Sequence, residues 1–149
     1  MEKVEVYDLY SSLAPIILNA LIEFNETRFS AAAVDDEDVP ENLKSTSAPP
    51  KENEWDTDEN WFARWDYVLN EMIFAFQSIV DDTESMYHDD YWEGEADVYF
   101  EPIGDGEFCE FKKGPNHTQT FLEEKYDKIN ARIQNGLMLF GKYYRNLWI

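Results

Sequence analysis

Three stretches of this 149-residue chain carry apolar side chains at spacings of three and four residues, which puts those side chains on one face of an α-helix. The spacing predicts helices at about residues 12–26, 58–80 and 121–148. Their stripes are, in chain order, Leu13, Ile16, Ile17, Ala20, Leu21 and Phe24; Trp61, Trp65, Val68, Met72, Phe76 and Ile79; and Leu122, Tyr126, Ile129, Ile133, Leu137, Phe140, Tyr144 and Leu147. Helices with such stripes bury them against one another, so the pattern predicts a bundle.

A β-hairpin is predicted between the second and third helices. Residues 97–101 and 107–111 resemble short strands, and the Gly-Asp-Gly sequence at 104–106 is typical of the turn that joins them. The predicted fold class is therefore α+β, mainly α: a three-helix bundle with a short β-hairpin between helices 2 and 3. The length suits a single domain over residues 1–149. Aromatic residues make up 16% of the chain, which favours a folded protein over a disordered acidic one.

Two connections separate the predicted helices. The first, a Pro-rich acidic loop at about 31–57, is unusually long for a compact domain, and is either a disordered insert or an ordered functional loop. Its composition favours disorder. The acidic run at 35–38 offers oxygen ligands for a divalent cation, but it lacks the alternating ligands and central glycine of a calcium loop, so no metal site is predicted. The second connection is an acidic hairpin region at about 82–119.

Charge is distributed unevenly along the chain. There are 32 Asp and Glu against 12 Lys and Arg, a net charge of −20, and residues 81–110 hold twelve acidic residues without a Lys or Arg. Such a protein repels nucleic acids and anionic membranes at long range and attracts basic surfaces. Residues 1–4 lack the start of a secretion signal, and no apolar run of about 18 residues predicts a membrane span. The alternative is that the acidic residues serve solubility alone.

A basic and aromatic cluster near the C-terminus is the candidate ligand site. A nucleotide needs a guanidinium or ammonium for its phosphates and a flat ring for its base. The candidate ligand-binding residues are Arg132, Lys142, Tyr143, Tyr144 and Arg145, joined by Trp55, Trp61 and Arg64 if the helices are antiparallel. The alternative is an ordinary helix face. Gly136 and Gly141 within the third helix indicate close helix packing or close approach of a ligand, and packing is favoured.

An acidic face is the candidate protein-binding site. It comprises Asp89, Asp90, Glu93 and Glu95, whose carboxylates resemble a row of phosphates to a nucleic-acid-binding groove. A nucleophilic site would require Cys109 to meet one of the two histidines, and the chain has no phosphate-loop or zinc pattern. We therefore predict no catalytic residue, no metal and no cofactor, and a protein that is not an enzyme.

Several segments resemble a family of small, mostly uncharacterised proteins of tailed bacteriophages. The segments are DDEDVP at 35–40, STSAPPKENEWDTD at 45–58, ARIQNG at 131–136 and LFGKYY at 139–144. The resemblance extends over most of the chain, from Leu13 to Trp148. It departs at residues 27–30, where relatives have a Lys-His-Gly type of turn, and at about 82–114, which looks longer or different here. The resemblance implies the cytoplasm of an infected bacterial host as the location.

Two functions are consistent with these features. The first is a non-enzymatic phage counter-defence protein that binds and sequesters a small nucleotide-derived immune signal through the C-terminal cluster. The alternative is an acidic DNA mimic that inhibits a host nucleic-acid-binding defence protein through the acidic face. The expected partner is accordingly a nucleotide-type ligand or a basic host protein, with no membrane and no direct nucleic acid. The five Trp also suit a homo-oligomer.

Overall fold

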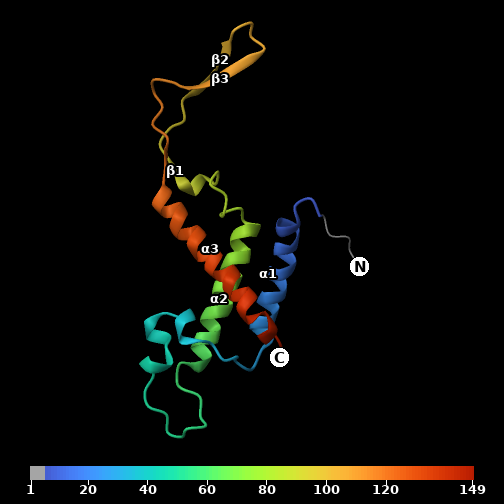
Figure 1. The fold of residues 1–149 in the computed structure, drawn as a ribbon, viewed down its shortest axis with the longest axis vertical. Helices are drawn as coiled ribbons and strands as arrows, with labels where there is room; N and C mark the ends of the chain where they lie inside the picture. Colours follow the sequence, from blue (N-terminus) through green and yellow to red (C-terminus); the bar gives the residue numbers. More distant parts are fainter. Residues whose placement is uncertain (1–5) are drawn as a thin grey trace.

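The computed structural model describes residues 6–149. Three long helices, α1 (Leu9–Thr27), α2 (Trp61–Val80) and α3 (Glu123–Tyr143), form the body of the molecule (Figure 1). The predicted mainly helical α+β fold, with a hairpin between α2 and α3, is confirmed. The expectation about a secretion signal falls on residues 1–5, outside the described residues.

Helix α2 lies at the centre of the body, because α1 and α3 both pack against it. A helix covered on two sides needs apolar residues around much of its circumference, and α2 buries its Trp65, Val68, Leu69 and Met72 almost completely. The core consists of Ala14, Leu18, Leu21, Val34, Val39, Trp65, Val68, Leu69, Met72, Phe76, Leu139 and Tyr143. No helix among residues 6–149 has an apolar stretch long enough to cross a bilayer.

The connection between α1 and α2 is folded. It contains three single-turn 3-10 helices, η1 (Asp36–Asp38), η2 (Glu41–Leu43) and η3 (Ser45–Ser47). Val34 and Val39 from this segment are buried in the core. The preference for disorder that composition suggested is therefore wrong for residues 34–47, where two valines enter the core and three 3-10 turns form.

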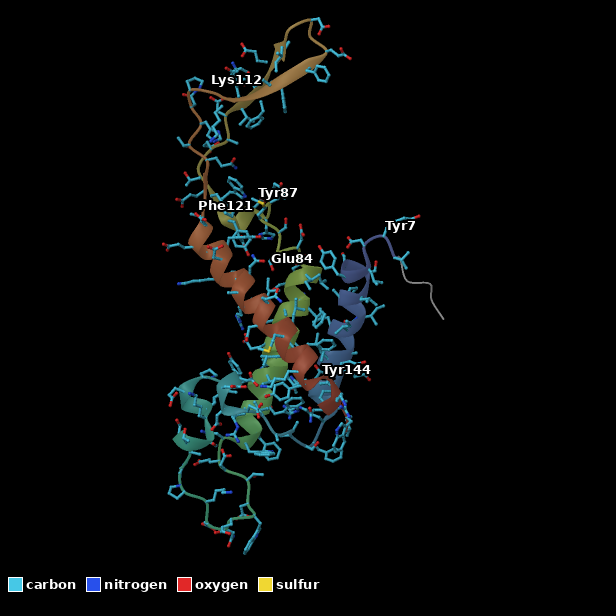
Figure 2. All side chains as sticks on the ribbon, viewed as in Figure 1. Tyr7, Glu84, Tyr87, Lys112, Phe121 and Tyr144 are labelled. Atoms are coloured by element: carbon cyan, nitrogen blue, oxygen red, sulfur yellow. The ribbon has the colours of Figure 1, made fainter. Side chains whose placement is uncertain are left out.

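The connection between α2 and α3 extends away from the helices. It passes through η4 (Asp89–Tyr91) and β1 (Trp92–Glu93), which pairs antiparallel with β4 (Thr120–Phe121) just before α3. Beyond this pair, β2 (Val98–Ile103) and β3 (Phe108–Lys113) form the predicted hairpin, which projects clear of the body in Figures 1 and 2. The turn has φ of 61° at Gly104 and 89° at Gly106, a left-handed conformation that favours glycine.

The α3 helix ends at Tyr143, five residues before the predicted end, and continues as the 3-10 turn η5 (Tyr144–Asn146). Close packing explains one of its two glycines. A Cβ added at Gly136 would lie 2.3 Å from the Glu71 carbonyl oxygen and 2.7 Å from the Ala75 Cβ, so α3 approaches the α2 backbone here. At Gly141 a Cβ would meet nothing within 4 Å, so helix packing does not account for that glycine.

The two glycines therefore predict opposite effects of the same substitution. Gly136→Ala should lower the free energy of unfolding by about 2 kcal/mol, because the methyl group forces α3 away from α2. Gly141→Ala should raise it by up to about 1 kcal/mol, because alanine stabilises an open helical position. Urea unfolding followed by circular dichroism measures both. Equal effects at the two positions would contradict the close approach at Gly136.

Candidate functional site

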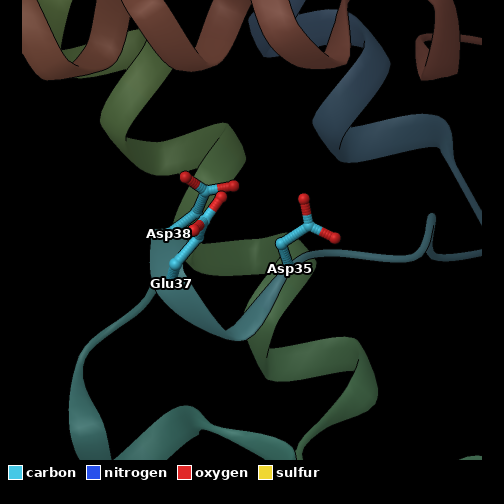
Figure 3. A group of neighbouring side chains, drawn as sticks. All are labelled: Asp35, Glu37 and Asp38. Atoms are coloured by element: carbon cyan, nitrogen blue, oxygen red, sulfur yellow. The ribbon is translucent and has the colours of Figure 1, made fainter.

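The ammonium of Lys142, near the end of α3, meets the acidic run of η1. Its Nζ lies 2.8 Å from Asp35 Oδ2, 3.2 Å from Glu37 Oε1 and 2.6 Å from Asp38 Oδ2. The three carboxylates converge in Figure 3, and one oxygen from each lies within 4.8 Å of the others. The run thus binds a lysine side chain of the same protein.

Tyr143 strengthens this attachment. Its hydroxyl donates a hydrogen bond to Asp38 and accepts one from the backbone N–H of Asp35, at 3.0 Å. Burial, together with the hydrogen bond to Asp38, raises the pKa of Tyr143 to about 12. Hydrogen bonds to Asp35 and Asp38 also raise the pKa of Lys142. Both groups therefore hold their protons in the folded state and fasten the α1–α2 connection to the end of α3.

Arg64, on α2, also binds the connection between α1 and α2. Its guanidinium forms two hydrogen bonds with the Asp58 carboxylate, at 2.8 and 2.7 Å, and is 3% exposed. A third bond, 3.3 Å long, reaches the Leu43 carbonyl oxygen. The hydrogen bonds from Arg64 lower the pKa of Asp58. Trp61 donates its indole N–H to the Ala31 carbonyl oxygen, at 3.3 Å, so both predicted ligand residues already have partners within the fold.

Arg132 is paired with a buried carboxylate. Its Nε lies 2.9 Å from Glu71 Oε2 and its Nη2 lies 2.8 Å from Glu71 Oε1. Glu71 is 6% exposed, and the guanidinium carbon lies 3.6 Å from the centroid of the Phe74 ring. Arg132 therefore neutralises an α2 carboxylate that folding removes from water.

The predicted nucleotide site is not assembled as one pocket. Trp61 and Arg64 line a shallow cavity of about 600 Å³, but its other walls include four carboxylates, from Asp35, Asp36, Glu37 and Asp58. Such a surface repels phosphate groups. Five of the eight predicted ligand residues are exposed: Trp55, Arg132, Lys142, Tyr144 and Arg145. Figure 2 shows Tyr144 at the far end of α3 from the hairpin.

The four predicted acidic-face residues lie on the segment that leaves α2, which we call the acidic neck (residues 81–97). Asp89 and Asp90 belong to η4, Glu93 to β1 and Glu95 to the turn after it, and all four are exposed. Within residues 6–149, none of their carboxylates forms an ion pair with a Lys or Arg. These carboxylates are free to meet an external partner.

Backbone hydrogen bonds order the neck. The Glu95 N–H donates to Thr118 Oγ1 at 2.9 Å, and the Asp97 N–H donates to His117 Nδ1 at 3.1 Å. His88 Nδ1 accepts from the Asp90 N–H at 3.2 Å. Both imidazoles thus hold turns of the neck. Cys109 stands opposite Pro102, well along the hairpin from these turns, so the structure does not bring it together with either histidine.

The chain matches no protein family, no curated protein and no solved structure. The resemblance to tailed-bacteriophage proteins therefore stays a prediction.

The ion pairs change the expected effect of reversing charge in the C-terminal cluster. Arg132→Glu should lower the free energy of unfolding by about 2 kcal/mol or more, because it leaves Glu71 buried beside a second carboxylate. Arg145→Glu should change it by less than about 0.5 kcal/mol, because that side chain is exposed and forms no ion pair among the described residues. Urea unfolding of the two variants tests this, and equal stability would contradict a structural role for Arg132.

The raised pKa of Tyr143 predicts that the free energy of unfolding falls at alkaline pH. Its pKa rises from an ordinary 10.0 to about 12 on folding, so its contribution is complete below pH 10 and is lost as the pH rises to about 12. The loss from this phenol is roughly 3 kcal/mol. Tyr143→Phe should therefore show a shallower fall in unfolding free energy over this window than the parent protein. Parallel curves would contradict the raised pKa.

Proposed function

We propose that this protein is a non-catalytic phage protein whose acidic neck binds the basic surface of a host protein and blocks its access to nucleic acid. The observation that carries the proposal is the set of four exposed neck carboxylates, which have no Lys or Arg partner among the described residues. Basic grooves that bind nucleic acid recognise a row of negative charges, and exposed carboxylates supply them.

The position of the neck supports this function. It leads from the helical body to the projecting hairpin, so a partner can contact it at this end of the body, beside the start of α3 (Figure 1). The neck holds eight acidic residues and no Lys or Arg, whereas the positive side chains of the body are mostly engaged in ion pairs. A basic partner therefore meets its strongest attraction at the neck.

The hairpin adds an apolar surface next to the neck. The register places Phe100 opposite Phe111 and Pro102 opposite Cys109, on one face of the two strands, while Glu101 opposite Glu110 lies on the other. Phe100 and Phe111 are 69% and 55% exposed. A two-stranded hairpin is marginally stable alone in water, and burying this face on a partner would stabilise it. Aromatic anchors flanked by charge are typical of protein interfaces.

Sequestration of a nucleotide signal is less well supported. Of the four cations in its predicted site, Arg64, Arg132 and Lys142 are engaged with carboxylates, which leaves Arg145 for a phosphate. Thermal unfolding with cyclic oligonucleotides and ADP-ribose derivatives tests this alternative directly. A ligand at a hundred times its dissociation constant would add about 2.7 kcal/mol of stability and raise the midpoint by several degrees.

Displacement of DNA from purified bacterial DNA-binding proteins tests the proposed function. In mobility-shift assays at low salt, the protein should release DNA from a susceptible binding protein, and the effect should weaken steeply as salt rises. The quadruple variant Asp89→Asn, Asp90→Asn, Glu93→Gln and Glu95→Gln should weaken it by about 10- to 100-fold, at roughly 0.5 kcal/mol for each lost charge or somewhat less.

A variant with the same change in net charge is the control. Glu23, Glu26, Glu52 and Glu54 are exposed carboxylates away from the neck, so their replacement by Gln should leave displacement nearly unchanged. Equal losses in the two quadruple variants would show that net charge alone acts. Failure to compete for any basic DNA-binding protein, while nucleotides raise the midpoint, would replace the proposal with sequestration.

A further inference from the structure

Helices α1 and α3 flank α2 and leave an apolar groove between them. The groove has a volume of about 350 Å³, and its walls are Ile16, Ile17, Ala20, Leu21 and Phe24 of α1 with Phe140, Tyr144 and Leu147 at the end of α3. We propose that a second copy of this chain occupies the groove, by packing its own α1 against α1 in an antiparallel, two-fold symmetric dimer.

Charge favours a second copy at this place. None of the eight groove residues is charged, and α1 carries no Asp, Glu, Lys or Arg from Leu9 to Ile22, in a protein with a net charge of −20. A basic partner is attracted to the carboxylates and gains nothing from a neutral helix. A second copy is repelled by the acidic surfaces, so it can approach most favourably where charge is missing.

The α1 sequence is complementary to itself across a two-fold axis. Ser12, Ile16, Ala20 and Phe24 follow one another at intervals of four residues and form one ridge, alternating small and large side chains. In an antiparallel pair with the axis at the level of Leu18, Ile16 faces Ala20 of the second copy, and Ser12 faces Phe24 of the second copy. Each large side chain therefore meets a small one, and every contact occurs twice.

The exposure of the groove residues agrees with a surface that only a second copy would cover. Ile16 is 55% exposed and Tyr144, on the opposite wall, is 62% exposed, although both border the groove. The second α1 would cover Ile16 and Ala20 and lie against the α3 wall. Isologous contacts of this kind are the commonest way in which soluble proteins form closed dimers.

Sedimentation velocity of the full chain, from about 1 to 300 µM, tests the proposal. We expect a concentration-dependent dimer that strengthens with added salt, because salt screens the repulsion between two acidic copies. This is the reverse of the salt effect expected for a basic partner. Ile16→Asp should raise the dissociation constant at least 10-fold. A wild-type protein that stays monomeric over the whole range would overturn the proposal.

A size exchange tests the pairing of Ile16 with Ala20. Ile16→Ala leaves a gap and Ala20→Ile creates a clash, so each should weaken the dimer by about 5- to 10-fold. The double variant restores one large and one small side chain at each contact and should return to within about threefold of wild type. Additive losses in the double variant would overturn the antiparallel pairing.

Substitutions in the hairpin test whether self-association uses the groove or the exposed apolar face of the hairpin. Phe100→Asp with Phe111→Asp should leave the dimer intact, and circular dichroism confirms that each variant is folded. A dimer lost in the hairpin variant and retained in Ile16→Asp would place self-association on the hairpin and overturn the proposal for the groove.

Discussion

The scarcity of positive charge is the constraint on which the rest of this structure depends. Residues 6–149 contain eleven Lys and Arg, and six of them form ion pairs with carboxylates of the same chain. Three of these pairs hold elements that are distant in sequence. Arg28 pairs with Asp66, Arg132 with Glu71, and Lys142 with the acidic run at 35–38. Folding therefore uses most of the available cations and leaves the carboxylates of Asp89, Asp90, Glu93 and Glu95 without a Lys or Arg partner among the described residues.

The ion pairs make the α1–α2 connection part of the folded body, whereas the acidic neck keeps a surface that is open to a partner. The α1–α2 connection is as acidic as the neck in its 35–38 run, yet Lys142 and Tyr143 bind those carboxylates and two valines enter the core. In the neck, Tyr91 is buried against Tyr126, and hydrogen bonds to Thr118 and His117 order the turns. The carboxylates of Asp89, Asp90, Glu93 and Glu95 nevertheless have no Lys or Arg partner among the described residues. Similar composition thus leads to a structural segment in one place and an open surface in the other.

The sequence predicts what depends on neighbours in the chain. Apolar spacing locates the three helices, and the Gly-Asp-Gly turn locates the hairpin, because both signals lie within a few residues of the structure that they specify. The partners of Lys142 and Arg132 lie 61 or more residues away, so no local pattern reveals them. The sequence groups Lys142 and Arg132 in a basic and aromatic cluster, and only tertiary packing shows that each meets a carboxylate. The candidate nucleotide site is the part of the prediction that this limitation affects most.

The same separation of charge makes the acidic surface compatible with self-association. A net charge of −20 opposes any contact between two copies, with an energy that falls as their charged surfaces move apart. The uncharged α1 stretch and the acidic neck occupy different parts of the chain, and beyond η4 the neck extends away from the helices (Figure 1). Two copies joined along α1 would therefore keep their necks outside the contact, and each neck would remain available to its own basic partner. When one neck of the dimer has bound a partner, the second neck is held nearby, so its effective concentration at a neighbouring site on that partner is raised.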